Sequence, residues 1–174
     1  GFQGGQLLIL AARPAMGKSA MAMNLAVQIA ENNKNGKATV AIFNLEMSAE
    51  QLMERMIASG SNIRLGNIKS GKIPPNEWGR FNNACIKLNS LNLYFDDSSD
   101  STINSIRAKC RKLAAEEGLD FVVIDYLQLI ESDSSSARAS QQEKVAKISR
   151  SLKLMARELN VPVLALSQLS RSFK

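Results

Sequence analysis

The stretch "LLILAARPAMGKSAMAMNLA", residues 7–26, decides the fold because it joins an apolar run to a helix through a loop of phosphate-binding type. The apolar run predicts a short strand, which Pro14 prevents from continuing, and a helix-permissive segment begins at Gly17. The letters between them approach the pattern G-x-x-x-x-G-K-[ST], with Ala12 in place of the first glycine. Because the pattern lies between a strand and a helix, we predict a nucleotide-binding loop despite Ala12.

Length and composition limit the class of protein. The 174 residues, 45% of them hydrophobic, with 10 Gly and 4 Pro, suit one globular domain with one core. The apolar runs are far shorter than the roughly 20 residues of a membrane-spanning helix, and no signal-peptide pattern opens the chain. We therefore expect a cytoplasmic protein without membrane contact. The net charge of +6 permits a nucleic-acid partner, and the absence of histidine excludes histidine-based catalysis.

Both cysteines lie on apolar stripes of predicted helices. The stripes consist of Trp78, Phe81, Cys85 and Leu88, and of Ile103, Ile106, Cys110 and Leu113. We therefore expect both thiols to pack in the core and expect neither a disulfide nor a zinc site.

Strands and helices alternate along the rest of the chain. Further strands are predicted at 38–46, 93–95, 120–125 and 161–168, and helices at 49–59, 75–89 and 102–117. Ser48 and Gln51 form a capping box at the start of the helix at 49–59. This alternation predicts an α/β fold with a mainly parallel sheet and helices on both faces.

The strongest helix pattern follows the serine-rich segment 131–142, which we expect to be a mobile surface loop. Apolar residues repeat there at helical spacing: Val145, Ile148, Leu152, Met155 and Leu159. Basic residues fall on the opposite side: Lys144, Lys147, Arg150, Lys153 and Arg157. We interpret that basic side as a solvated helix face.

The carboxyl ends of the strands carry the polar residues from which a site could be built. A triphosphate needs backbone N–H groups, a cation at the β and γ oxygens, and a hydroxyl on magnesium. Gly17 allows close approach of the backbone, Lys18 supplies the charge, and Ser19 supplies the metal ligand. These residues predict triphosphate binding.

Three more strand ends carry candidate groups. Asp125 closes the strand "FVVID" and suits a carboxylate that orients magnesium through its water shell, although it could also cap a turn. Glu46 could polarise the water that attacks the γ-phosphate, although it could also be a charge at the start of the following helix. Gln168 could hydrogen-bond the γ-phosphate or that water.

Taken together, the motifs "ARPAMGKS", "FNLEMS", "DDSS", "VIDYLQL" and "SRSLKLMARELNVPVLALSQLSRS" resemble the C-terminal motor domain of bacterial replicative DNA helicases of the DnaB type. The resemblance covers essentially the whole chain, with the motifs in the family's order. Family members carry alanine at the first loop position, followed by Arg-Pro. Ala12 is therefore a mark of the family and not a defect.

The resemblance implies a RecA-like P-loop fold and ATP with Mg²⁺. It carries over Glu46 as the catalytic base, Lys18 and Gln168 as catalytic partners, and Ser19 and Asp125 as metal-side residues. The nucleotide-binding residues that it implies are Arg13, Pro14, Ala15, Met16, Gly17, Lys18, Ser19, Ala20 and Arg55. Arg55 could instead be an ordinary surface arginine, and Arg138 is at most a modest DNA contact.

The resemblance also implies a homo-hexameric ring that moves along single-stranded DNA and unwinds the duplex during replication. Primase and a helicase loader are the expected partners of the full-length protein. We expect residues 1–174 to be a partial motor domain, without the N-terminal primase-binding domain and without the C-terminal end that carries the arginine finger and the second DNA-binding loop. The alternatives are another RecA-like ATPase, such as a recombinase or a clock-type ATPase, and a non-catalytic nucleotide-binding assembly module.

Overall fold

A computed structural model describes residues 1–32, 38–98, 102–125 and 141–168, with the side chains of 141 and 142 left aside. The strands are β1 (Leu7–Ala12), β2 (Val40–Asn44), β3 (Leu93–Asp96), β4 (Phe121–Asp125) and β5 (Val163–Gln168). The helices are α1 (Lys18–Glu31), α2 (Ala49–Ser61), α3 (Leu65–Lys69), α4 (Trp78–Asn89), α5 (Ile103–Glu116) and α6 (Gln141–Leu159), and a 3₁₀ turn spans Pro75–Glu77.

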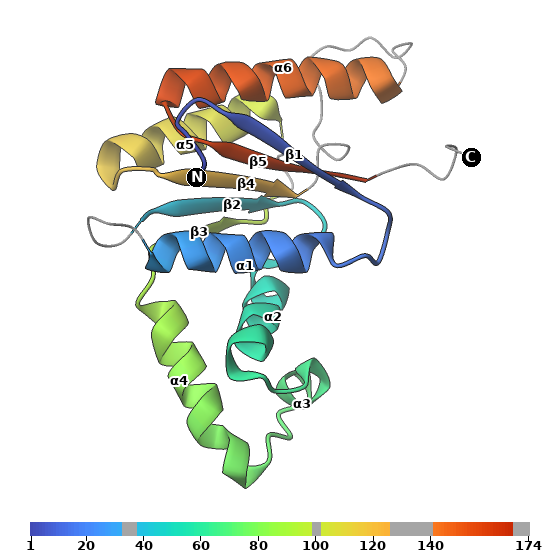
Figure 1. The fold of residues 1–174 in the computed structure, drawn as a ribbon, viewed down its shortest axis with the longest axis vertical. Helices are drawn as coiled ribbons and strands as arrows, with labels where there is room; N and C mark the ends of the chain where they lie inside the picture. Colours follow the sequence, from blue (N-terminus) through green and yellow to red (C-terminus); the bar gives the residue numbers. More distant parts are fainter. Residues whose placement is uncertain (33–37, 99–101, 126–140, 169–174) are drawn as a thin grey trace.

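The strands form one parallel sheet in the order β1-β5-β4-β2-β3 (Figure 1). Because the strands are parallel, their carboxyl ends meet at one edge. The order separates β1 from β4 by a single strand, β5. The outer strand β1 pairs only with β5 among the described strands, and Ile9 on it is 53% exposed.

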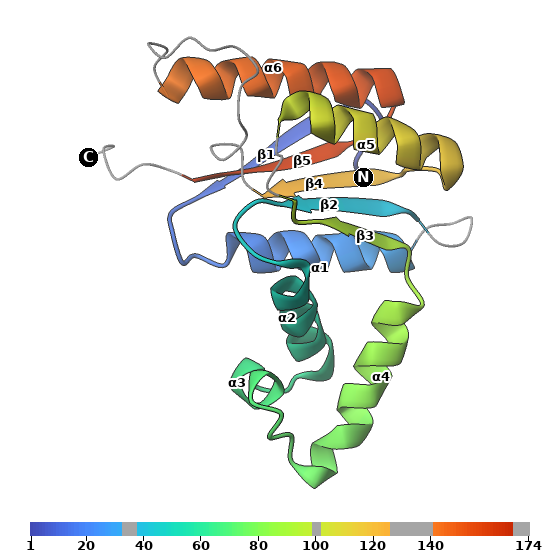
Figure 2. The same cartoon turned by 180° about the vertical axis from the view of Figure 1, so that it is seen from behind.

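Helices cover both faces of the sheet, as the sequence predicts (Figures 1 and 2). On one face, α5 and α6 bury Ile106, Cys110, Leu152 and Met155 against the strands. On the other face lie α1 and then α2, while α3 and α4 lie farther from the sheet. Parallel strands buried on both sides carry nearly continuous apolar runs, and "FVVI" in β4 is fully buried.

Element bounds differ from the predictions where tertiary contacts decide them. The strand predicted at 38–46 ends at Asn44, because the Asn44 side chain accepts hydrogen bonds from the next turn. Residues 141 and 142, predicted as the end of a loop at 131–142, are instead the first residues of α6. The rest of that predicted loop lies outside the described residues. The short helix α3 was not predicted. The capping box of Ser48 and Gln51 is confirmed.

The two cysteine stripes are buried to different degrees. Cys110 is fully buried on α5, whereas Cys85 on α4 is only half-buried. Trp78, placed on the same stripe as Cys85, is 45% exposed and packs edge-on against Phe81. The core packing predicted for the two thiols is therefore confirmed for Cys110 and only partly met by Cys85, because α4 packs mainly on α2.

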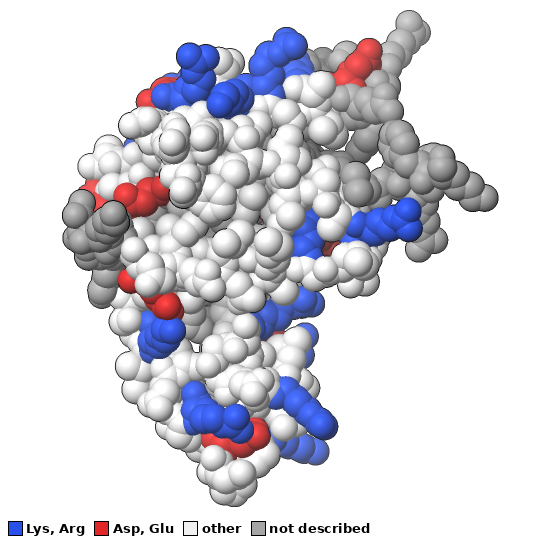
Figure 3. Space-filling view, viewed as in Figure 1, with Lys and Arg blue, Asp and Glu red and all other residues white. Residues whose placement is uncertain are grey.

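The outer side of α6 is basic and exposed, as expected. All five of its predicted lysines and arginines are exposed: Lys144, Lys147, Arg150, Lys153 and Arg157. Figure 3 shows Lys and Arg side chains gathered along the side of the molecule where α6 lies. The amphipathic pattern therefore predicts the orientation of α6 correctly.

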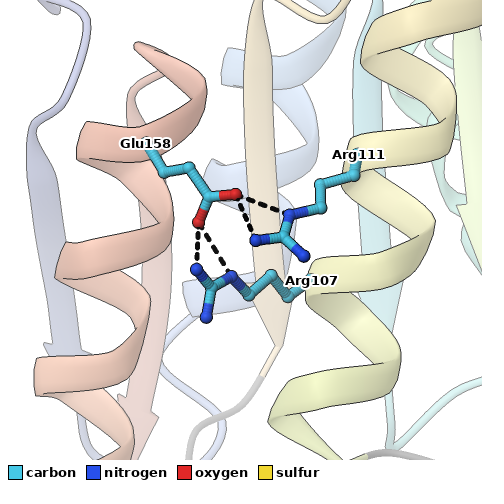
Figure 4. Close-up of polar contacts among 3 residues, drawn as sticks. All are labelled: Arg107, Arg111 and Glu158. Carbon is cyan, nitrogen blue, oxygen red and sulfur yellow. Dashed lines mark hydrogen bonds and ion pairs between the residues drawn. The ribbon is translucent and has the colours of Figure 1, made fainter.

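A carboxylate joins α5 to α6. Glu158 accepts hydrogen bonds from Arg107, with Nε at 2.8 Å from Oε2, and from Arg111, with Nε at 2.5 Å from Oε1 (Figure 4). These bonds, first from Arg107 and then from Arg111, hold the pKa of Glu158 below its usual value. Two guanidinium groups on one carboxylate fix the two helices relative to each other on that face of the sheet.

Candidate nucleotide site

The loop between β1 and α1 has the backbone that binding of an anion requires. Gly17 is the N-cap of α1 with φ 77° and ψ 18°, and Ala15 also has a positive φ of 62°. Gly17 therefore adopts a left-handed backbone conformation, which costs free energy in residues that carry a Cβ atom. A Cβ atom at Gly17 would meet no protein atom within 4 Å, so this side of the loop is open. The N-terminal N–H groups of α1 have no side-chain cap and are available to an anion.

Ala12 causes no strain in this geometry. It lies in β1, in register with Gln168 of β5, and it is not among the described residues with positive φ. A side chain is therefore acceptable at the first position of the loop, where the phosphate-binding pattern has glycine.

Asp125 is the buried carboxylate of the site. It ends β4 and is 1% exposed. Lys18 Nζ lies 3.2 Å from its Oδ1, and the Ser19 hydroxyl donates a short hydrogen bond to its Oδ2. Sheet order explains the contact, because only β5 separates β1 from β4, and α1, which follows β1, packs against both β5 and β4. The three residues predicted for phosphate and metal are thus in contact.

Glu46 lies in a turn that is held at both ends. The N–H groups of Glu46 and Met47 donate to Asn44 Oδ1 at 3.0 and 2.7 Å. On the other side, the N–H of Ala49 donates to Asp97 Oδ2 at 2.8 Å. The Glu46 side chain itself is exposed. The turn therefore fixes the backbone of a carboxylate that solvent and ligands can reach.

One pocket of about 250 Å³ collects the predicted residues. It is lined by Ala12, Arg13, Pro14, Ala15, Met16, Gly17, Lys18, Ser19, Ala20, Glu46, Met47, Arg55 and Gln168. The structure therefore brings together every predicted nucleotide-binding residue, with the predicted base and sensor. Asp125 lies beneath this lining, in contact with Lys18 and Ser19. Arg138 lies outside the described residues.

The surroundings of the pocket suit a polyanion. Arg55 on α2 is exposed and lines the pocket together with the residues of the loop. The molecule is notched between the sheet and the α2–α4 region on the side where α1 begins, and Lys and Arg side chains border the notch (Figure 3).

Sequence reasoning assigned no role to Met47, which lines the pocket, or to Asn44, which holds the Glu46 turn. The signal for Asn44 was its place at the end of a buried strand. Its partners lie two and three residues later, as in an Asx turn.

Comparison with known proteins agrees with the geometry. The model of the DnaB-like helicase C-terminal domain matches residues 1–174. The chain belongs to this family. It is 50% identical to the replicative DNA helicase DnaB of Geobacillus stearothermophilus over 99% of its own length, and 46% identical to the replicative DNA helicase DnaC of Bacillus subtilis over 98%. It spans 37% of each of these relatives.

Solved structures share the fold. A solved ATPase domain superposes with a TM-score of 0.88 at 34% identity, over 98% of this chain and 60% of that one. A DnaB-like replicative helicase studied with primase gives the same TM-score and identity, over 98% of this chain and 40% of that one. The RecA-like α/β fold predicted for the DnaB-like family is thus confirmed. None of the described helices is long and apolar enough to cross a membrane.

Proposed function

We propose that this domain is the ATP-hydrolysing motor of a replicative DNA helicase. The observation that carries the proposal is the single pocket in which the phosphate loop, the Glu46 turn and Gln168 meet above the buried Asp125. A cradle of backbone N–H groups, a lysine and a hydroxyl is what a triphosphate requires. Membership in the DnaB-like family supports ATP as that triphosphate.

The residues fit Mg²⁺ as the metal. Mg²⁺ prefers oxygen ligands and usually takes one or two carboxylates together with substrate phosphates and water. The Ser19 hydroxyl and the Asp125 carboxylate supply that chemistry at one point. When bound, Mg²⁺ neutralises charge on the β and γ oxygens. Ser19 would be its direct ligand, and Asp125 would orient its water shell.

Each of the remaining groups would have its own role in ATP hydrolysis. Lys18 would hold the β and γ oxygens, and the N-terminus of α1 would hold the phosphates through Gly17 and its neighbours. Glu46 would accept a proton from the attacking water. Gln168 would contact the γ-phosphate or that water, and Arg55 would contact the nucleotide from α2.

The full-length protein would act as a homo-hexamer on single-stranded DNA, in the cytoplasm, with primase and a loader as partners. Similarity to a helicase structure studied together with primase supports the primase assignment. The chain spans 37% of its DnaB and DnaC relatives, which supports the proposal that residues 1–174 are part of a motor domain within a longer protein. An arginine supplied by a neighbouring subunit would complete the site, since such residues carry a large part of the rate in P-loop enzymes.

The test uses the full-length protein and Glu46→Gln. We expect DNA-stimulated ATP hydrolysis to fall by about 100-fold or more, because a positioned base contributes about that much, while nucleotide binding is retained. The matched control is Glu50→Gln, an exposed charge in the first turn of α2, and it should leave the rate unchanged.

Three outcomes would contradict the proposal. An unchanged rate in Glu46→Gln would remove the catalytic assignment. A wild-type ring without ATP hydrolysis would favour the non-catalytic module. Hydrolysis without unwinding of a forked duplex would favour a recombinase or a clock-type ATPase.

A further inference from the structure

Asn44 and Asp125 lie side by side at the carboxyl ends of neighbouring strands. They are register partners in the β2–β4 pair. Side chains alternate along a strand, and Ile42 and Val123, two residues earlier, both pack with α1. The side chains of Asn44 and Asp125 therefore both project to the α1 face, where Asp125 meets Lys18 and Ser19.

The two ends of the Asn44 amide differ in their partners. Oδ1 accepts two hydrogen bonds, from the N–H groups of Glu46 and Met47. Nδ2 is buried and has no hydrogen-bond partner among the described residues, and Asn44 as a whole is 1% exposed. Buried amide donors are almost always paired, so a donor left over beside a site for phosphate and metal points to an acceptor that binds there.

We propose that Asn44 is a positioning residue that couples the Glu46 turn to the metal side of the site. Oδ1 fixes the backbone that carries Glu46, and Nδ2 donates to a water molecule that Asp125 also holds, in the shell of the bound metal. This inference rests on the function proposed above and extends it to a residue that touches neither the nucleotide nor the attacking water. The far end of the Glu46 turn is fixed from outside β2, by Asp97 and by the α2 capping box.

The first test is Asn44→Ala in the full-length protein. At saturating Mg²⁺, which compensates for the lost Nδ2 donor, we expect kcat for ATP hydrolysis to fall about tenfold or more. KM for ATP should stay within about twofold, because the remaining effect acts on the base and not on the phosphate loop. In a Glu46→Gln background the same substitution should cause no further loss, since the two residues act as a unit. Additive losses, or a loss of nucleotide affinity alone, would mean that Asn44 has only a structural role and would overturn the proposal.

The second test needs no nucleotide. Amide hydrogen exchange in the peptide covering 45–52 should be faster in Asn44→Ala, because two N–H groups lose their acceptor. Asn44→Ser should restore part of this protection and part of kcat, since a serine hydroxyl makes the same turn more weakly. The serine variant also keeps the test valid if Asn44→Ala does not fold. A serine variant no better than alanine, where both fold, or one with wild-type exchange and tenfold lower kcat, would overturn the role of Oδ1.

The role of Nδ2 is tested by the Mg²⁺ requirement. Serine is too short to replace the donor, so Asn44→Ser should need several-fold more Mg²⁺ for half-maximal binding of a non-hydrolysable ATP analogue. A wild-type Mg²⁺ requirement would overturn the assignment of Nδ2.

The matched control is Ser61→Ala at the far end of α2. It also removes a buried hydrogen bond, in which Ser61 Oγ donates to Ile57 O at 2.6 Å. Ser61 lies about 18 Å along the helix from Ala49, at about 1.5 Å per residue. We expect wild-type exchange at 45–52 and wild-type kcat. A tenfold loss of kcat in this control would show that lost stability alone explains Asn44→Ala. Failure of Glu46→Gln to slow hydrolysis would instead reject the proposed function. The failure of the Asn44 proposal can therefore be told apart from the failure of the proposed function.

Discussion

Replacing Lys18 by methionine should destabilise the protein as well as weaken nucleotide binding, because it leaves the Asp125 carboxylate buried without its cation. Asp125 is 1% exposed and the side chain of Lys18 is 11% exposed, so water replaces little of the lost interaction. The Ser19 hydroxyl remains as the second partner of Asp125.

The magnitude follows from the geometry. With 3.2 Å between Lys18 Nζ and Asp125 Oδ1 and an effective dielectric constant of about 20, the attraction is about 5 kcal/mol. Removing one partner of a buried pair costs about 3–5 kcal/mol, and the bond from Ser19 favours the lower value of about 3 kcal/mol. For 174 residues, with an unfolding entropy of about 2.1 cal/mol/K per residue, this corresponds to a fall in Tm of about 8 °C.

The assay is thermal unfolding followed by circular dichroism without nucleotide, with Lys87→Met as the control. Lys87 pairs with Glu31 at 2.7 Å, closer than Lys18 to Asp125, but its side chain is 60% exposed. A surface pair contributes about 0–1 kcal/mol, so the control should lower Tm by about 3 °C or less. Equal shifts in the two variants, or no shift in Lys18→Met, would refute the argument that burial decides the strength of these pairs.

Three further predictions test the loop, the core and the α5–α6 contact. Gly17→Ala should lower the free energy of unfolding by about 1–2 kcal/mol and weaken nucleotide binding, because φ at Gly17 is 77° and alanine there is strained; unchanged urea unfolding would contradict this. Burial raises the pKa of the Cys110 thiol to about 12. As pH rises above about 9, the thiol therefore loses its proton in the unfolded chain before it does in the folded one, and the stability should fall. Urea unfolding at several pH values should show this fall in the wild type and not in Cys110→Ala. Hydrogen bonds from Arg107 and Arg111 lower the pKa of Glu158. Their contribution to the free energy of unfolding is therefore present above the usual glutamate pKa and is lost as pH falls through the lowered value. Glu158→Gln should therefore be less stable than wild type at neutral pH, and the difference should shrink in acid; a difference independent of pH would contradict it.

Local signals in the sequence predicted much of the fold. The phosphate loop, the capping box of Ser48 and the amphipathic pattern of α6 each depend on residues within a few positions of one another, so they are visible without tertiary structure. The parallel sheet followed from strands that alternate with helices. The carboxyl-edge rule then placed Glu46, Asp125 and Gln168 near the loop before any contact was known.

The contacts that sequence could not predict are non-local. Insertion of β5 between β1 and β4 is a property of strand order, and it decides which strand ends are neighbours. The register of Asn44 with Asp125 joins residues 81 positions apart, and the bond from Ala49 to Asp97 joins α2 to the residue that follows β3. Trp78 shows the converse limit. Its apolar stripe is real, but the surface that the helix packs on decides how much of the stripe is buried.

The position of β1 at the margin of the sheet has a consequence for the behaviour of the domain in solution. Among the described residues, β1 pairs on one side only, and a strand with an unpaired side can accept another strand, from a further segment of chain, from a partner or from a second copy of itself. Ile9 on that strand is more than half exposed, and its apolar side chain would favour such pairing because the added strand would bury it. At high concentration the isolated 174-residue domain should therefore self-associate in a way that is independent of nucleotide. Ile9→Lys should suppress this self-association, because a charge on an edge strand opposes strand addition.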